Sequence, residues 1–192
     1  MPLFSSKVSH RRESLWPASV GVLAVIAANI GDGDWARRSA IAWMIGSWGA
    51  RLSVQALYAP GAERLGDFRF LNSDVRLATA LLVFAMPAAI ASRNPDPSLS
   101  VIEFAACALW IIAFAAETTA DRQWLRFFAN PEHADLVCRS GLWRYSAQAH
   151  AISDTLIWIA IALFASASPW GWIAFACPLL RAAQLALTSP QK

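Results

Sequence analysis

The chain has 192 residues, of which 57% are hydrophobic and only 15% charged, and its mean hydropathy is +0.41. A soluble domain carries about 25% charged residues, so this composition excludes an ordinary water-soluble fold, and also the collagen-like and disordered classes. The net charge of +3 does not indicate nucleic-acid binding, because the basic residues lie in short clusters between apolar runs. The three cysteines include no C-x-x-C pair and give neither a disulfide framework nor a zinc signature.

Six segments are apolar enough to cross a bilayer, which takes about 20 residues of helix. They lie near residues 14–31, 36–58, 75–92, 99–119, 148–166 and 168–187. The first follows a basic start, as a signal peptide would. No convincing small-x-small cleavage site precedes Asp32, however, so we expect a retained helix. The sequence therefore predicts an all-α, polytopic membrane protein with about six transmembrane helices in one bundle, a single membrane domain over residues 1–192.

The Lys and Arg residues predict the orientation of these spans, because cytoplasmic segments carry the excess of positive charge. With a cytoplasmic N-terminus, thirteen of the sixteen basic residues are inside, and only Arg37, Arg38 and Arg93 are outside. We therefore expect both termini in the cytoplasm, and the Ala- and Arg-rich composition favours a bacterial inner membrane. The outer connections are short, whereas the inner segments near 59–74 and 120–147 are longer, and the second contains most of the polar residues.

Ionisable side chains inside a membrane are costly and are functional candidates by default. Four of them stand out, namely Arg51, Glu103, Glu117 and Asp154. Two interpretations are open for Arg51, which either extends its long stem to the inner interface or serves the function directly. Glu103 lies one turn inside the outer end of its span without an obvious partner, and we expect it to reach water there.

Ser146, His150 and Asp154 recur every four residues, which places them on one face of the fifth expected helix. A histidine and a carboxylate one turn apart can orient an imidazole and hold a proton for transfer. Alternatively, they only satisfy each other or dock a neighbouring helix. We expect no metal site, because a third ligand at helical spacing is absent. His150 and Asp154 are the candidate catalytic pair.

Charged residues also collect where the fourth span is expected to leave the membrane. The stretch from Asp121 to Arg126 is either a solvated helix end with local ion pairs or part of a basic pocket. Such a pocket would bind a phosphate-bearing cofactor or a lipid headgroup through Arg122, Arg126, Arg139 and Arg144. The sequence contains no G-x-G-x-x-G, Walker or G-x-S-x-G motif, so any nucleotide would need a membrane-type site. We expect most of the ten tryptophans at the membrane interfaces.

This region contains two recognisable blocks, Glu117-Thr-Thr-Ala-Asp121-Arg-Gln123 and Gly141-Leu-Trp-Arg-Tyr-Ser146. The first is similar to the A-D-x-Q motif, and the second to the start of the G-L-W-x-x-S-R-H-P-N-Y-x-G-E motif, of the bacterial branch of the steroid 5-alpha-reductase superfamily. Trp48-Gly49-Ala50-Arg51-Leu52 also resembles the family's W-G-x-R-L segment, and Asp67-Phe-Arg69-Phe resembles its D-x-R-[YF]. The similarity covers roughly residues 40–180.

The resemblance implies a multi-helix membrane fold with a cytoplasm-facing NADPH and substrate segment at residues 117–154. It implies reduction of an activated carbon–carbon double bond in a lipophilic steroid, isoprenoid or fatty-acyl compound. With the basic residues above, the cofactor side comprises Arg51, Asp121, Gln123, Arg126, Trp143, Arg144, Tyr145 and Ser146. The methyltransferase cousins of this superfamily, which use S-adenosylmethionine at a similar place, give a further alternative.

After Ser146 the sequence departs from the family pattern. R-H-P-N-Y-x-G-E is replaced by Ala147-Gln-Ala-His150-Ala-Ile-Ser-Asp154, so His150 stands at the Asn position and Asp154 at the Glu position. The replaced arginine would have been a bidentate partner that nothing adjacent supplies. The basic, aromatic tail usual in the family is also missing before Lys192. A second hypothesis is therefore a catalytically degenerate relative that binds a lipid or joins a membrane-protein complex.

Overall fold

The computed structural model describes residues 3–58, 74–133 and 136–188, and within these ranges it contains helices and no strand. The six α-helices of these ranges are α1 (Leu3–Ile30), α2 (Trp35–Tyr58), α3 (Asp74–Ala91), α4 (Val101–Phe128), α5 (Ala149–Ser166) and α6 (Ala176–Thr188). Each overlaps one of the predicted apolar segments, so the all-α prediction is confirmed. Two of them, α4 and α5, are long and apolar enough to cross a membrane. The motif at Asp67–Phe70 lies outside the described residues.

Two helix boundaries differ from those of the predicted spans. Helix α4 continues to Phe128, past the end of the predicted span at 119, because Ala120, Asp121 and Trp124 still bury one face of it, so the residues from Asp121 to Arg126 are helical as one of the two interpretations has it. Helix α6 begins only at Ala176, because the chain first makes a turn with Trp170 in the left-handed region (φ 63°) and a short 3-10 helix, η5 (Gly171–Phe175). Because α4 is longer than the predicted span, its polar residues after 119 lie on a regular helix that can form one wall of a binding site.

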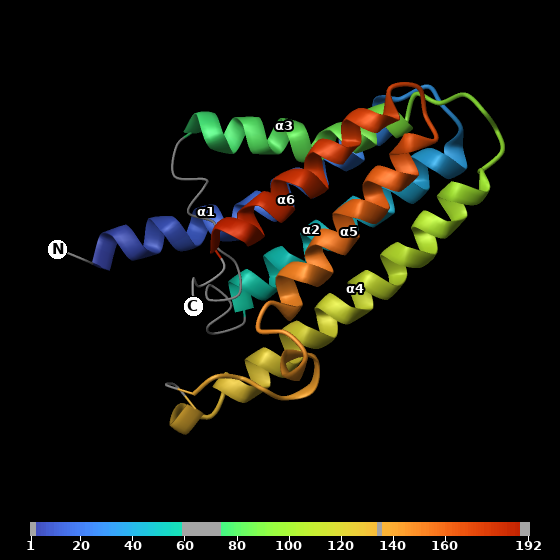
Figure 1. Cartoon of the computed structure of the whole chain (residues 1–192). Helices are drawn as coiled ribbons and strands as arrows, with labels where there is room; N and C mark the ends of the chain where they lie inside the picture. The colour runs from blue at the N-terminus through green and yellow to red at the C-terminus, as the bar shows by residue number, and fades with distance from the viewer. Residues whose placement is uncertain (1–2, 59–73, 134–135, 189–192) are drawn as a thin grey trace.

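The three predicted outer connections meet at one end of the bundle (Figure 1). The backbone N–H of Gly33 donates to the carbonyl of Ser92 (2.9 Å), and that of Asp34 donates to the carbonyl of Asn94 (3.0 Å). The amide of Asn94 in turn donates to the carbonyl of Ala167 (3.1 Å). We call this end the Arg37 end. The opposite end, where α4 leads through residues 129–148 into α5, is the Arg51 end.

A chain of aromatic rings fills the core between α1, α3, α5 and α2. Trp16 meets Phe84 edge to face at 5.3 Å, Phe84 meets Trp158 at 4.5 Å, and Trp158 meets Trp48 at 5.0 Å. Half of the ten tryptophans are buried inside the bundle. They are Trp16, Trp48, Trp110, Trp124 and Trp158. Their large rings fill the space that the many alanines of the facing helices leave.

Helices α1 and α2 approach each other closely at small residues. A Cβ on Gly49 would lie 2.4 Å from the carbonyl oxygen of Pro17, and one on Gly21 would lie 3.5 Å from Gly46. Small residues at such crossings let two helix backbones touch, as in membrane helix pairs. This contact fixes the rotation of α2, which turns Trp48 into the core and places Arg51 opposite α4.

Candidate functional site

A buried ion pair joins α2 to α4 at the Arg37 end. The guanidinium of Arg37 donates to both carboxylate oxygens of Glu103, at 2.5 and 3.1 Å. Its remaining hydrogen bonds go to the carbonyl oxygens of Asn94 (3.4 Å), Asp96 (2.5 Å) and Ser98 (2.8 Å). All five guanidinium donors are thus used. The expectation that Glu103 reaches water is wrong, because the side chain is fully buried against Arg37.

Local hydrogen bonds complete this end. The backbone N–H and the hydroxyl of Ser100 both donate to Glu103, which forms a capping box at the start of α4. In the loop before it, hydrogen bonds from the backbone N–H and the hydroxyl of Ser98 hold the pKa of the Asp96 carboxyl below its usual value. Every polar atom of the ion pair therefore has a hydrogen-bond partner, and the pair stabilises the contact between α2, α4 and the loop before α4.

A second buried group of charges joins α2, α4 and α5 at the Arg51 end. Arg51 donates to Asp121 (2.6 Å) and is ion-paired with Glu117. Nδ1 of His150 lies 2.7 Å from the other oxygen of Asp121 and 3.7 Å from Glu117. We call these four residues the Arg51 cluster. The interpretation in which Arg51 only extends to the interface is wrong, because its charged end is engaged inside the bundle.

Asp154 belongs to a neighbouring contact rather than to His150. Its two carboxylate oxygens accept hydrogen bonds from the indole N–H of Trp48 (2.9 Å) and from Nε of Arg181 (2.5 Å). It thereby ties α5 to α2 and α6. His150 and Asp154 do share a helix as predicted, yet their hydrogen bonds lead to different helices. Ser146 does not share their face, because α5 begins only at Ala149 and Ser146 precedes it as an acceptor for the N–H of Gln148.

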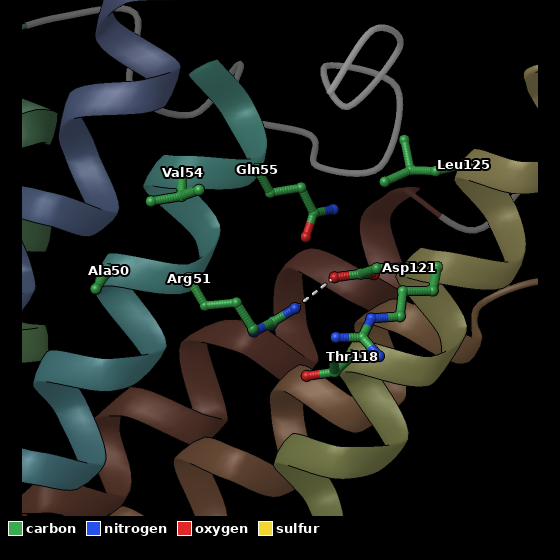
Figure 2. A pocket seen from close by; sticks show the side chains of 8 residues that line it. Ala50, Arg51, Val54, Gln55, Thr118, Asp121 and Leu125 are labelled. Atoms are coloured by element: carbon green, nitrogen blue, oxygen red, sulfur yellow. Dashed lines mark hydrogen bonds and ion pairs between the residues drawn. The ribbon is translucent and has the colours of Figure 1, made fainter. Parts of the chain in front are cut away.

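A cleft of about 450 Å³ opens between α2 and α4 beside the Arg51 cluster. Figure 2 shows Arg51 and Asp121 directed toward each other across it, with Gln55 and Leu125 beyond. Its lining residues are Ala50, Arg51, Val54, Gln55, Thr118, Asp121, Arg122 and Leu125. Arg51 and Asp121 are thus the two predicted cofactor residues that line the cleft, and Asp121 stands between it and His150.

Gln123 and Trp143, a residue of the segment Gly141–Ser146, make hydrogen bonds within the protein that connect this segment to α4. The side-chain oxygen of Gln123 accepts a hydrogen bond from the backbone N–H of Leu142 (2.8 Å), and the indole N–H of Trp143 donates to the carbonyl of Ala120 (2.8 Å). Gly141 has φ +57°, and a Cβ there would lie 2.3 Å from the Gln123 amide, so this turn requires glycine. The two blocks of the resemblance therefore contact each other.

The predicted cofactor residues do not converge on one place. Asp121 and Gln123 are two residues apart, which turns their side chains about 200° apart around the axis of α4. Only one of them can face the cleft, and that one is Asp121. Arg126, Arg144 and Tyr145 are exposed, as is Arg139 of the proposed basic pocket.

A family model described as "Protein of unknown function (DUF1295)" matches residues 5–190. The chain belongs to the DUF1295 family. No curated protein and no solved structure matches it. Because the family description states no activity, the function of this DUF1295 protein must be argued from its site.

The Arg51 cluster of this DUF1295 protein also contains three potential metal ligands. Single ligand atoms of Glu117, Asp121 and His150 lie within 4.8 Å of one another. The sequence predicts no metal site, because the fifth helix offers no third ligand at helical spacing. In the structure, two of the three potential ligands come from another helix, α4. Arg51 already pairs with the carboxylates of Glu117 and Asp121, so its guanidinium supplies the positive charge that a metal cation would otherwise supply.

Sequence reasoning missed two partners in these contacts, Arg37 and Arg181. From the sequence, both are counted only among the charges that orient the spans, yet each pairs with a buried carboxylate. A signal was present, because a fully buried acidic residue requires a cation nearby. Matching Glu103 and Asp154 to the arginines nearest in depth would have suggested both pairs.

Proposed function

We propose that this DUF1295 protein is a multi-pass membrane protein with six spans, both termini in the cytoplasm and the Arg51 end on the cytoplasmic side. Large apolar side chains on the outer faces of the helices support the proposal. They include Val22 and Ile26 on α1 and Phe104, Ile111 and Ile112 on α4, all exposed on the isolated chain. Apolar surface of this extent is stable when lipid covers it. The excess of Lys and Arg in the segments we place in the cytoplasm supports the orientation.

The Arg51 end is the site of a reductase acting on a carbon–carbon double bond conjugated to a carbonyl in a lipophilic steroid, isoprenoid or fatty-acyl substrate. One observation carries this proposal: a continuous series of contacts from His150 through Asp121 to the cleft. A proton held by the buried imidazole can move to Asp121 across 2.7 Å and from there to a bound molecule. Asp121 is then the catalytic residue, and His150 acts through it.

The other buried charges keep this series in place. Arg51 holds Asp121 and Glu117 together, and Glu117 faces the imidazole of His150 at 3.7 Å. Asp154, bonded to Trp48 and Arg181, fixes the turn of α5 that follows His150. Without these contacts the imidazole could rotate away from Asp121. Asp154 is therefore proposed as a positioning residue.

NADPH is the proposed cofactor, and the cleft fits one end of it. Arg51 and Arg122 both line the cleft, and Arg122 is exposed at its rim. These two groups would hold a carboxamide or phosphate of the cofactor. When bound, NADPH supplies the hydride that the reduction needs. The side-chain oxygen of Gln123 and the indole N–H of Trp143 make hydrogen bonds within the chain, so we propose only Arg51, Asp121 and Arg122 for the cofactor side.

The test is NADPH oxidation by the full chain in lipid nanodiscs with a long-chain enone as substrate. We expect turnover that Asp121→Asn lowers at least tenfold, because the amide cannot pass on a proton. Asp32→Asn, an exposed acid in the loop after α1, is the matched control and should keep the rate. Equal rates for both variants would contradict the proposed role of Asp121.

A second candidate function is lipid binding without catalysis. The observation that favours it is the use of Gln123 and Trp143 as internal hydrogen-bond partners, since these residues are then unavailable to a cofactor. NADPH fluorescence titration separates the two candidates. Saturable micromolar binding favours the reductase. Absence of NADPH binding, together with a lipid that co-purifies and is identified by mass spectrometry, favours the lipid-binding protein.

A further inference from the structure

The outer face of α4 is uncharged over most of its length. Every exposed side chain of the helix before residue 120 lacks a charge. These side chains recur at helical spacing, with one stripe formed by Phe104, Ala108, Ile111, Ala115 and Thr119. From Val101 to Thr119 the helix rises about 27 Å, close to the hydrocarbon thickness of a bilayer, about 30 Å. The length of this face therefore matches the depth over which lipid chains cover a membrane helix.

The same stripe then continues with two arginines. Arg122 and Arg126 keep the spacing of three and four residues, and both are exposed. They lie about 5 and 10 Å beyond Thr119 along the helix axis, which is the level of phospholipid headgroups when the stripe before them lies in hydrocarbon. Among the described residues, neither guanidinium has a hydrogen-bond or ion-pair partner. Both are therefore available to a partner outside the chain.

The segment 136–145 brings two more arginines to this level, where the chain turns back beside the end of α4 (Figure 1). The two hydrogen bonds that attach the segment to α4 lead to Ala120 and Gln123, on either side of Arg122 in the sequence. Arg144 directly follows the attached residues, and Arg139 precedes them by three; both are exposed. We use the name basic surface for these four residues, Arg122, Arg126, Arg139 and Arg144.

The basic surface combines an excess of positive charge with exposed apolar groups. Residues 122–145 contain four arginines and two acidic residues. Near Arg139 the side chain of Val137 is 68% exposed, and next to Arg144 that of Tyr145 is 85% exposed. A soluble anion would use the charge alone, whereas the interface of a bilayer offers phosphate to arginines and a partly apolar medium to such side chains. The composition therefore favours a lipid as the partner.

We infer that the basic surface binds the headgroups of anionic phospholipids, whose acyl chains lie along the uncharged face of α4. The inference rests on the part of the proposed function that places the bundle across a membrane, and it needs neither the reductase nor the cleft. Charge-assisted hydrogen bonds from the guanidinium groups hold the lipid phosphate. A zwitterionic lipid has the same phosphate, but its choline cation cancels the net charge that attracts the arginines.

Native mass spectrometry of the full chain in detergent micelles measures the binding of single lipid molecules. The probes are dioleoyl phosphatidylglycerol and dioleoyl phosphatidylcholine, which differ in the headgroup only. We expect the first molecule of phosphatidylglycerol to bind at least about tenfold more tightly, since each arginine near an anionic surface accounts for about fivefold. Equal affinities, or tighter binding of phosphatidylcholine, would overturn the inference.

Arg126 and Arg93 are a matched pair of exposed arginines at opposite ends of the bundle, and neither has an ion-pair partner among the described residues. Arg126→Gln should weaken phosphatidylglycerol binding about fivefold, and adding Arg144→Gln should bring the loss to at least about tenfold. Arg93→Gln should leave it unchanged. Unchanged binding of phosphatidylcholine shows that each variant is folded. Equal losses for Arg126→Gln and Arg93→Gln would overturn the assignment to the basic surface.

The soluble compound sn-glycerol 3-phosphate distinguishes a lipid site from a site for free phosphate compounds. It carries a phosphate like that of the lipid but has no acyl chain to lie on α4. In large excess it should leave phosphatidylglycerol bound. Displacement of the lipid by this compound would overturn the assignment to a phospholipid.

Reduction of an enone is measured separately in phosphatidylcholine nanodiscs, which contain no anionic lipid. Selective binding of phosphatidylglycerol without any turnover would contradict the reductase and leave this inference intact. Turnover by a protein that does not distinguish the two lipids would do the reverse. The two proposals therefore fail in different measurements.

Discussion

The two ends of the bundle both contain a buried Arg–Glu pair between α2 and α4, but the surroundings of the two pairs differ. At each end a fully buried glutamate of α4 is paired with an arginine of α2, and the same fourteen residues separate Arg37 from Arg51 and Glu103 from Glu117. Fourteen residues are nearly four helical turns, so the repeated residues fall on one face of each helix. Both pairs therefore connect the same faces of α2 and α4, one at each end of the bundle.

The difference lies in how completely the arginine is satisfied. Arg37 uses all five donors, three of them on backbone carbonyls of the loop before α4. Arg51 makes a hydrogen bond to Asp121, lacks an acceptor for Nε and lies beside a cleft. A completely satisfied buried pair holds a structure together, whereas an incompletely satisfied one beside a cavity is suited to bind something. We therefore assign structure to the Arg37 end and function to the Arg51 end.

The largest expected effect comes from breaking the Arg37 end. Arg37→Met leaves Glu103 and three carbonyls without their donor and should cost about 3–5 kcal/mol of stability. The neighbouring Arg38→Met removes bonds to the carbonyls of Ala28 and Asn29 and should cost only about 1 kcal/mol. Thermal unfolding in detergent measures both. A double variant, Arg37→Met with Glu103→Leu, should regain part of the loss, and equal losses for Arg37→Met and Arg38→Met would contradict the assignment.

An intermediate effect is expected from Gly141, which shows that the Arg51 end has structural residues too. Gly141→Ala places a Cβ against Gln123 at positive φ and should cost about 2–3 kcal/mol. In a Gln123→Ala background the collision disappears, so the additional cost should fall to about 1–2 kcal/mol for the backbone alone. Unfolding of the four proteins of this cycle measures the difference. An unchanged cost in both backgrounds would show that Gln123 does not hold the turn.

The smallest effect is expected from Trp48. Trp48→Phe keeps most of the ring packing but removes the N–H that Asp154 accepts, while Arg181 continues to hold the carboxylate. The loss should be about 1 kcal/mol in thermal unfolding. Trp43→Phe is the control, because Trp43 is exposed on the same helix and should show no change. A loss above about 3 kcal/mol would mean that Asp154 depends on Trp48 alone.

The helices were predictable because each is a long apolar run bounded by polar or turn residues. Pairing between helices was not, because Arg37 and Glu103 are 66 residues apart and no local pattern connects them. The burial of the end of α4 was not predictable because the hydropathy pattern weakens at Asp121, although that side chain is buried by its partners Arg51 and His150.

The candidate site was predicted in its residues more than in its contacts. His150, Asp121 and Arg51 were singled out from helical spacing and from the resemblance, and they do meet. Spacing could not show that His150 turns toward α4 while Asp154 turns toward α2 and α6, since both positions allow either neighbour. Gln123 was placed with the cofactor because a motif records which residues occur together and not which atoms they contact.

The most direct test of the account compares Glu103→Gln with Glu117→Gln, the same change at two fully buried positions of one helix. Thermal unfolding and NADPH-dependent reduction of a long-chain enone are measured on both proteins. We predict that Glu103→Gln loses at least about 2 kcal/mol of stability and keeps the turnover of the folded protein. Glu117→Gln should lose less than about 1 kcal/mol, because Arg51 keeps Asp121, and should lower turnover at least about fivefold, because Arg51 and His150 lose the carboxylate that faces both of them beside Asp121. The same pattern of stability and turnover in both variants would contradict the division between the two ends.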